Sequence, residues 1–282
     1  MPLVTGRELL RRALREGYAV AAFNVITLEV LQGVLDAAEE EEAPVFVQFN
    51  PGNLRHVSLT YAAALGRAAA EQASVPVILH LDHGETYAQA VACLRAGFTS
   101  LMYDGNAETF ENNIAITCKV REMAAAVGVP VEGELGRIAG REEEFDVAAE
   151  DAELTDPEAA REYVERTNVD SLAVAVGNVH GQTTRAARLD LDRLRRIRSV
   201  VDLPLVLHGA SGLPDDQVQA AIKLGVCKFN VATQLNQGYL HAMAAAGKAA
   251  PQDLRTLLTQ ARRAVKAAAQ ERIRQFGSSG RA

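Results

Sequence analysis

The feature that most constrains the fold is a regular alternation between short apolar runs and longer amphipathic stretches. The apolar runs predict eight strands, at residues 19–25, 45–49, 77–81, 100–103, 131–135, 171–176, 205–207 and 228–231. The stretches between them favour helices, among them 27–41, 61–72, 87–96, 157–167 and 215–224. Strands that alternate with helices form right-handed βαβ units around a parallel sheet. Eight such units predict a (β/α)8 barrel, with an open doubly wound sheet as the less favoured alternative.

The predicted barrel accounts for the whole chain as one domain. The 282 residues contain 48% hydrophobic residues, which suffices for a full core, and no linker divides them, so we expect a single domain over residues 1–282. The Ala-rich segment 252–276 predicts extra C-terminal helices. The connection 136–156 has little apolar periodicity, and a structureless segment of that length is usually a functional lid or a mobile loop.

Charge and hydropathy exclude several classes of protein. The net charge of −7 argues against a nucleic-acid-binding surface. Three cysteines without CxxC spacing favour a reducing compartment, and the absence of a long apolar run predicts no signal peptide or membrane span, so we expect a cytoplasmic protein. We interpret the basic residues near the C-terminus as a solvated helix face: Arg255, Arg262, Arg263, Lys266, Arg272 and Arg274.

Three of the six histidines follow separate predicted strands, and each is followed by glycine: His83, His180 and His208. The carboxyl ends of parallel barrel strands meet at one mouth, where active sites lie. Three imidazoles delivered there can bind zinc and leave a coordination position open, which is the arrangement of catalytic zinc sites. One such histidine would more often be a packing residue, but three favour a metal site. The remaining histidines are ambiguous or structural: His80, His56 and His241.

Carboxylates collect at the same strand ends: Asp82, Asp104, Glu132 and Glu134. Burying a carboxylate costs several kcal/mol unless a cation or donor compensates it, so these residues are expected at a metal or substrate site. We interpret Glu132 as a hydrogen-bond acceptor that orients a histidine, in preference to a ligand.

Two small-residue segments follow the last two predicted strands. HGASG contains Ser211 and NVAT contains Thr233, and both precede helices. Backbone N–H groups at helix starts suit a phosphate, and barrels commonly bind phosphate in these loops. HGASG alone could be a plain helix-capping turn, but beside a metal site the phosphate interpretation is favoured.

Five motifs occur together in this order: HLDHG, EGELG followed by Gly140 and Glu142, DSLAVAVGNVHG, LVLHGASGLPD and KFNVAT. In this order and spacing they resemble the class II, zinc-dependent fructose/tagatose-bisphosphate aldolases. The closing QFGSSGRA is similar to that family's C-terminus, so the resemblance runs nearly end to end.

The resemblance implies a role for each matching position. His83, His180 and His208 would hold Zn²⁺, and Asp104 and Glu134 would form a second position for a divalent or monovalent cation. Asp82 would be the proton donor to the aldehyde oxygen, and Glu142 would carry the carbon-bound proton. Dihydroxyacetone phosphate would be held by Asn24, Gly181, Gly209, Ala210, Ser211, Asn230, Val231, Ala232 and Thr233. The family also implies a homodimer or homotetramer.

Some positions depart from the family pattern and leave the sugar open: Asn50, Asn106, Ala107, Asn178, Thr183 and Thr184. The implied reaction is reversible cleavage of fructose or tagatose 1,6-bisphosphate to dihydroxyacetone phosphate and glyceraldehyde 3-phosphate. A modified or deoxy ketose phosphate is the alternative substrate.

Carbon–carbon cleavage needs an electron sink, and no lysine is well placed for a Schiff base. Lys228, which begins a predicted strand, is expected at the end away from the barrel mouth. A zinc ion is therefore the expected sink. Two other functions are weighed: a metal-dependent hydrolase, which lacks its early His-x-His pair here, and a non-catalytic sugar-phosphate-binding subunit, which should have lost ligands.

Overall fold

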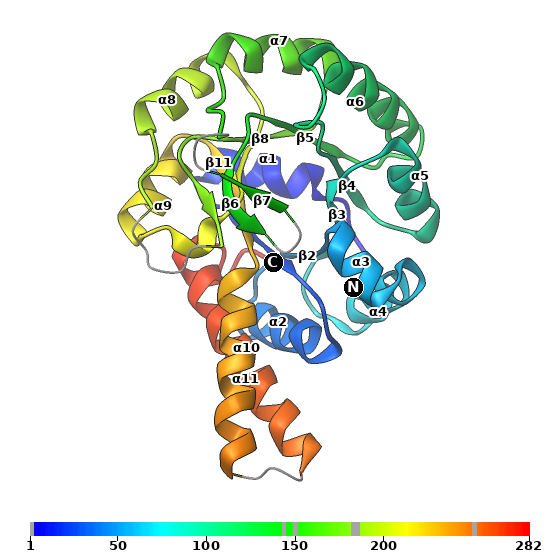
Figure 1. The fold of residues 1–282 in the computed structure, drawn as a ribbon, viewed down its shortest axis with the longest axis vertical. Coiled ribbons are helices and arrows are strands. Elements are labelled where there is room, and N and C mark those ends of the chain that lie inside the picture. Colours follow the sequence, from blue (N-terminus) through cyan, green and yellow to red (C-terminus); the bar gives the residue numbers. More distant parts are fainter. Residues whose placement is uncertain (1–2, 143–144, 149–151, 182–186, 250–252) are drawn as a thin grey trace.

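Eight parallel strands form a closed barrel (Figure 1). The computed structural model describes residues 3–142, 145–148, 152–181, 187–249 and 253–282. Pairing of the first strand with the last closes the barrel, which confirms the predicted (β/α)8 fold. The barrel strands are β1 (Val20–Asn24), β2 (Val45–Phe49), β3 (Val77–Gly84), β4 (Ser100–Tyr103), β5 (Val131–Leu135), β8 (Ser171–Val174), β10 (Leu205–Leu207) and β11 (Val226–Val231).

Helices surround the barrel: α2 (Leu28–Glu40), α3 (Pro51–Val57), α4 (Leu59–Gln72), α5 (Tyr87–Ala96), α6 (Phe110–Ala125), α7 (Pro157–Thr167), α8 (Leu191–Val200) and α9 (Asp215–Lys223). Polar side chains before them, such as Thr27 and Asp156, accept hydrogen bonds from the first turn. An N-terminal helix, α1 (Gly6–Glu16), packs Leu10 and Ala13 against the amino-terminal end of the barrel. Within the described ranges, no helix is both long and apolar enough to cross a bilayer.

Two helices extend beyond the barrel: α10 (Thr233–Ala249) and α11 (Leu254–Gln275). They pack against each other, and α11 also packs on α2, where Arg262 forms an ion pair with Asp36 at 2.6 Å. The prediction of a solvated basic face is wrong for Arg272, which is only 1% exposed. Its guanidinium is buried because Gln234 and the carbonyl oxygen of Ser211 accept its hydrogen bonds.

Strand alternation divides the barrel residues between two environments. Outward side chains such as Phe23, Leu79 and Phe229 pack against the helices. The alternate side chains face the interior, where contacts connect strands that are not neighbours in the sheet. Toward the carboxyl ends these inward positions are polar: Asn24, Gln48, His80, Asp82, Glu132, Glu134, Lys228 and Asn230.

The connection 136–156 contains regular structure, so the prediction of a structureless segment is wrong. Strands β6 (Ala139–Glu142) and β7 (Phe145–Val147) form an antiparallel pair, and β6 pairs in parallel with β9 (Val179–His180). Backbone hydrogen bonds pair these strands, and runs of four and three residues are too short for hydrophobic periodicity to reveal. In Figure 1, β6 and β7 cross the barrel in projection. Residues 143–144 and 149–151 lie outside the described part of the chain.

Gly133 in β5 is expected to be essential for packing. A Cβ there would lie 2.7 Å from the ring and from the hydroxyl oxygen of Tyr163. That hydroxyl is held by hydrogen bonds to Thr117 and Asn113. Gly133→Ala should therefore lower the free energy of unfolding by about 1–3 kcal/mol. Urea denaturation would measure this, with Gly247→Ala as control, because a Cβ at position 247 of α10 meets no atom within 4 Å. Equal stability of the two variants would contradict the expectation.

Candidate metal and substrate site

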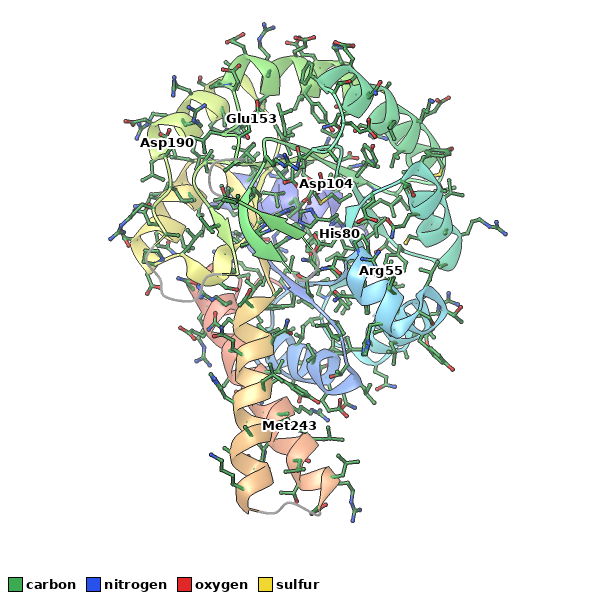
Figure 2. The ribbon with its side chains drawn as sticks, in the orientation of Figure 1. Arg55, His80, Asp104, Glu153, Asp190 and Met243 are labelled. Atoms are coloured by element: carbon green, nitrogen blue, oxygen red, sulfur yellow. The ribbon has the colours of Figure 1, made fainter. Side chains whose placement is uncertain are left out.

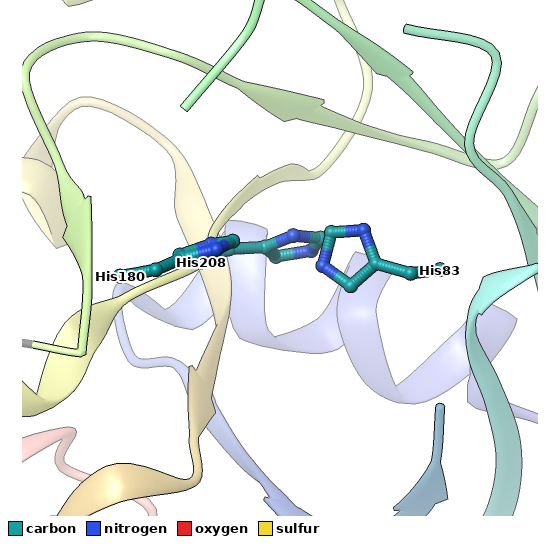
Figure 3. Close-up of side chains that lie close together, drawn as sticks. All are labelled: His83, His180 and His208. Atoms are coloured by element: carbon teal, nitrogen blue, oxygen red, sulfur yellow. The ribbon is translucent and has the colours of Figure 1, made fainter. Parts of the chain in front are cut away.

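Three histidine side chains meet at the mouth of the barrel (Figure 3). His83 is the next-to-last residue of β3, His180 ends β9 and His208 follows β10. The ring centroids of His83 and His208 are 4.5 Å apart, and those of His180 and His208 are 6.2 Å apart. One nitrogen from each ring lies within 4.8 Å of the others, so the structure brings together the three predicted ligands.

The backbone of His83 allows two consecutive residues to face the site. Its φ is 45°, in the left-handed region that non-glycine residues rarely adopt, and the pairing of β3 with β4 shifts register at this point. Regular alternation would turn His83 outward if Asp82 faces inward. The break in alternation instead presents both side chains to the barrel mouth, and such local strain is common at functional sites.

Two carboxylates lie on one side of His83. Its Nδ1 is 2.7 Å from Asp104 Oδ2 and 3.5 Å from Glu134 Oε2. Glu134 Oε2 is also 3.4 Å from His208 Nδ1. His83, Asp104 and Glu134 form a second group that could hold a cation, at the position expected from the sequence.

The electrostatics of the cluster suit a bound cation. Burial raises the pKa of Glu134 well above its usual value, and the nearby Asp104 carboxylate adds to the effect. Burial lowers the pKa of His208, as do His83 and Lys228. Within the described chain, the buried atoms His208 Nδ1 and Glu134 Oε2 accept no hydrogen bond. Imidazole nitrogen and carboxylate oxygen are both zinc ligands, so the residues present fit the metal.

The other ring nitrogen of His208, Nε2, is hydrogen-bonded to a carboxylate in the barrel interior. Nε2 lies 3.1 Å from Glu132 Oε1, which agrees with the predicted orienting role of Glu132. Lys228 Nζ donates to Glu132 Oε2 at 2.9 Å. The expected position of Lys228 was wrong: it is the third residue of β11 and is fully buried in the barrel interior, directly beneath the site. His80 also lies in this layer, with Nε2 3.4 Å from Lys228 Nζ (labelled in Figure 2).

Asp82 is fully buried and is surrounded by side-chain amides. Its Oδ2 accepts from Asn24 at 2.8 Å and from Gln48 at 3.2 Å, and its Oδ1 accepts from Asn230 at 2.8 Å. Three donors fix the carboxylate in one orientation beside His83. Sequence reasoning missed Gln48, although a single polar residue at an inward position of the apolar strand VFVQF was an available signal.

The two segments expected to bind phosphate lie side by side. Gly209 adopts a left-handed φ of 66° and leads into the turn Ala210–Gly212. The hydroxyl oxygen of Ser211 accepts a hydrogen bond at 3.4 Å from the backbone N–H of Gln234, which lies in the first turn of α10. Arg272 Nη2 donates to the Ser211 carbonyl oxygen at 2.9 Å, a contact that sequence reasoning did not anticipate.

The remaining residues expected to bind substrate lie at or just after the ends of β9 and β11. Asn230 and Val231 end β11, and Ala232 leads into Thr233 at the start of α10. Gly181 follows β9 with a left-handed φ of 74°. Gly209 borders the histidine cluster, since a Cβ there would lie 3.0 Å from the His180 ring, and Asn230 reaches Asp82, the neighbour of His83.

A cavity of about 330 Å³ opens beside the histidines on the side of β4 and β5. His83, Glu134 and His180 form one wall, and Ile138 from the 136–156 connection contributes to another. Cavities of this size hold small ligands. Two of the positions that depart from the family pattern also line it: Asn106 and Ala107.

Other departures have structural roles. Asn50 caps α3, because its side chain accepts from the Asn53 amide at 2.8 Å. Asn178 donates to the His208 carbonyl oxygen at 3.1 Å and so fixes the backbone of that histidine. Thr183 and Thr184 lie outside the described residues. The backbone of Glu142 pairs with Phe145, which places Glu142 at the end of β6.

Comparison with known proteins agrees with this geometry. Residues 4–281 match the model of the family "Fructose-bisphosphate aldolase class-II". A fructose-bisphosphate aldolase of Thermus caldophilus is 42% identical over 305 residues, covering 99% of this chain and all of the relative.

Solved structures share the fold. The YdjI aldolase of Escherichia coli K12 has a TM-score of 0.89 at 38% identity and covers 99% of both chains. A putative fructose-1,6-bisphosphate aldolase of Coccidioides immitis has the same TM-score at 31% identity, over 97% of this chain and 96% of that one. The chain therefore belongs to the class II fructose-bisphosphate aldolase family, whose members are carbon–carbon lyases of carbohydrate metabolism.

Proposed function

We propose that the protein is a zinc-dependent ketose-1,6-bisphosphate aldolase. The reaction is reversible cleavage of fructose 1,6-bisphosphate, or of tagatose 1,6-bisphosphate, to dihydroxyacetone phosphate and glyceraldehyde 3-phosphate. The observation that carries the proposal is the meeting of His83, His180 and His208 next to the buried carboxylate of Asp82. The fructose-bisphosphate aldolase of Thermus caldophilus, at 42% identity, supports the choice of substrate class.

The metal site and Asp82 divide the chemistry between them. When bound by the three histidines, zinc acts as a Lewis acid toward the substrate carbonyl and stabilises charge beside it. Among the described residues, Asn24, Gln48 and Asn230 donate amide N–H hydrogen bonds to Asp82, so its carboxylate is held as a proton acceptor. In cleavage it takes the proton of the hydroxyl that becomes the aldehyde oxygen, and in condensation it returns that proton.

The dihydroxyacetone phosphate half is assigned to the loops after β10 and β11. The phosphate lies at the backbone N–H groups of the turn Ala210–Gly212 and of the first turn of α10, with the Ser211 and Thr233 hydroxyls as further donors. Gly181 and Gly209 allow close approach because neither carries a side chain. Asn24 and Asn230 border the reacting carbons through their contacts with Asp82.

Glu142 is assigned the transfer of the carbon-bound proton. The support is its place on β6, which pairs directly with the strand that carries His180. The long connection is proposed to cover the bound substrate and exclude water during the reaction. A second cation at Asp104 and Glu134 remains part of the proposal, as do a dimeric or tetrameric assembly and a cytoplasmic location.

One alternative substrate has a specific observation in its favour. Asn106 and Ala107 line the cavity beside His83, where the family usually has Ser-His. A modified or deoxy ketose phosphate is therefore the second candidate. A non-catalytic binding subunit is disfavoured because the three histidines and Asp82 are all retained.

A retro-aldol assay against fructose and tagatose bisphosphates and their monophosphates tests the function. Cleavage should release dihydroxyacetone phosphate, stop on metal chelation and return when Zn²⁺ is added. His208→Ala should lose both zinc and activity, because one of three ligands is missing. His241→Ala, on the exposed face of α10, is the matched control. Full zinc content and normal turnover in His208→Ala would refute the metal site.

Asp82→Asn should keep its zinc and lose about 10²–10⁴-fold in cleavage rate, because an amide cannot accept the hydroxyl proton. Steady-state kinetics and metal analysis of the same sample measure both quantities. Asp202→Asn, whose side chain is 99% exposed, is the control. Loss of zinc in Asp82→Asn would make Asp82 a ligand or structural residue.

Glu142→Ala should nearly abolish solvent hydrogen exchange into dihydroxyacetone phosphate and leave zinc content unchanged. The reason is that the proposed carrier of the carbon-bound proton is gone while the three ligands remain. NMR of dihydroxyacetone phosphate in D₂O measures the exchange. Glu143→Ala and Glu144→Ala should be much milder. Exchange at the wild-type rate in Glu142→Ala would assign the proton to another group.

A further inference from the structure

A layer of buried ionisable groups lies directly beneath the three histidines, and the proposed chemistry does not use it. It consists of His80, Glu132 and Lys228, which come from β3, β5 and β11. All three are almost inaccessible to solvent, with exposed fractions of 0%, 2% and 0%. These strands are not neighbours in the sheet, so the contacts among the three run across the barrel interior.

The contacts form a directed chain toward the metal site. Lys228 Nζ donates to both carboxylate oxygens of Glu132, at 2.9 and 3.2 Å. Glu132 Oε1 accepts from His208 Nε2 at 3.1 Å. A histidine that donates through Nε2 has its lone pair on Nδ1, and that atom is the one that faces Glu134 and the histidine cluster. The chain therefore selects which nitrogen of His208 is offered to a cation.

Stability alone does not explain such a layer. A buried ion pair is often no more stabilising than apolar residues of the same volume, because both charges lose their hydration. The barrel below this layer is filled by apolar side chains, including Val20, Phe46 and Ile78. A further apolar layer would have been compatible with the same fold. The charges of Glu132 and Lys228 instead lie in the layer where Glu132 contacts His208, a candidate metal ligand.

We propose that Lys228 is a positioning residue that holds Glu132 against His208 and thereby sets the zinc affinity and coordination geometry of the site. This inference rests on the proposed zinc site. Lys228 donates hydrogen bonds to both oxygens of Glu132, so the carboxylate cannot turn away from the His208 imidazole. Hydrogen-bonded carboxylates of this kind orient metal-bound histidines, and their loss typically weakens metal binding about 10–100-fold.

Two physical explanations of the role of Lys228 predict opposite changes in zinc affinity for Lys228→Met. If Lys228 acted only through its charge, removing a cation near the site would tighten zinc binding. If it acts by holding Glu132, removal should weaken zinc binding by about 10–100-fold. The zinc dissociation constant of the purified protein, measured by competition with a chromophoric chelator, distinguishes them. The visible absorption spectrum of the Co²⁺-substituted protein should also change, because it reports ligand geometry.

A second variant covers the case in which Lys228→Met leaves Glu132 uncompensated and fails to fold. Lys228→Met combined with Glu132→Leu removes both charges and replaces them with apolar volume, which buried ion pairs tolerate well. The double variant should fold but bind zinc at least about 10-fold more weakly than wild type. Ser100→Ala is the control, since Ser100 contacts His80 in the same layer and has no hydrogen bond to Glu132 or His208.

Zinc affinity at the wild-type level, or tighter, in either folded variant would overturn the positioning role. Such a result would leave the proposed function intact, because wild type and His208→Ala test the metal site independently. Failure of the wild-type protein to bind zinc would instead remove the proposed function, and the positioning role with it.

Discussion

Parallel pairing of β1 with β11 closes the barrel and fixes the positions of Lys228 and Asn230, two buried residues on which the site depends. Its register sets Val20 against Lys228 and Ala22 against Asn230. Asn230 then reaches Asp82, 148 positions away in the sequence, and Lys228 reaches Glu132 across the interior. Contacts between residues so far apart in the sequence cost more loop-closure entropy than local contacts do. The site is consequently a product of the whole fold and cannot be assigned to any one βα unit.

The barrel could be predicted because each strand is a short apolar run between helical stretches, and closure by parallel strands follows from their number. The 136–156 connection could not. Its strands β6 and β7 have four and three residues and are paired by backbone hydrogen bonds, and runs this short show no side-chain periodicity. The prediction that Arg272 is solvated was wrong because composition shows only that the helix is basic. Burial of its guanidinium depends on which face of α11 meets the Ser211 turn.

The candidate ligands could be predicted because convergence of strand ends is a property of the topology. His83, His180 and His208 required only the approximate end of each strand. The groups around them required exact register, since a shift of one residue moves a side chain to the other face of the sheet. Gln48 and Lys228 lie inside strands, and only register shows that they reach Asp82 and Glu132. The left-handed backbone of His83 is a further feature that residue types alone do not reveal.

The pairing of β6 with β9 links the backbone of the 136–156 connection to that of His180, a candidate metal ligand. Gly140 lies directly against His180, and a Cβ at position 140 would approach the His180 carbonyl oxygen to 2.3 Å. The strand that carries Glu142 and the strand that carries His180 are thus joined by backbone pairing at a position where a side chain has no room. A side chain at position 140 would therefore push β6 away from β9 and disturb the backbone of His180.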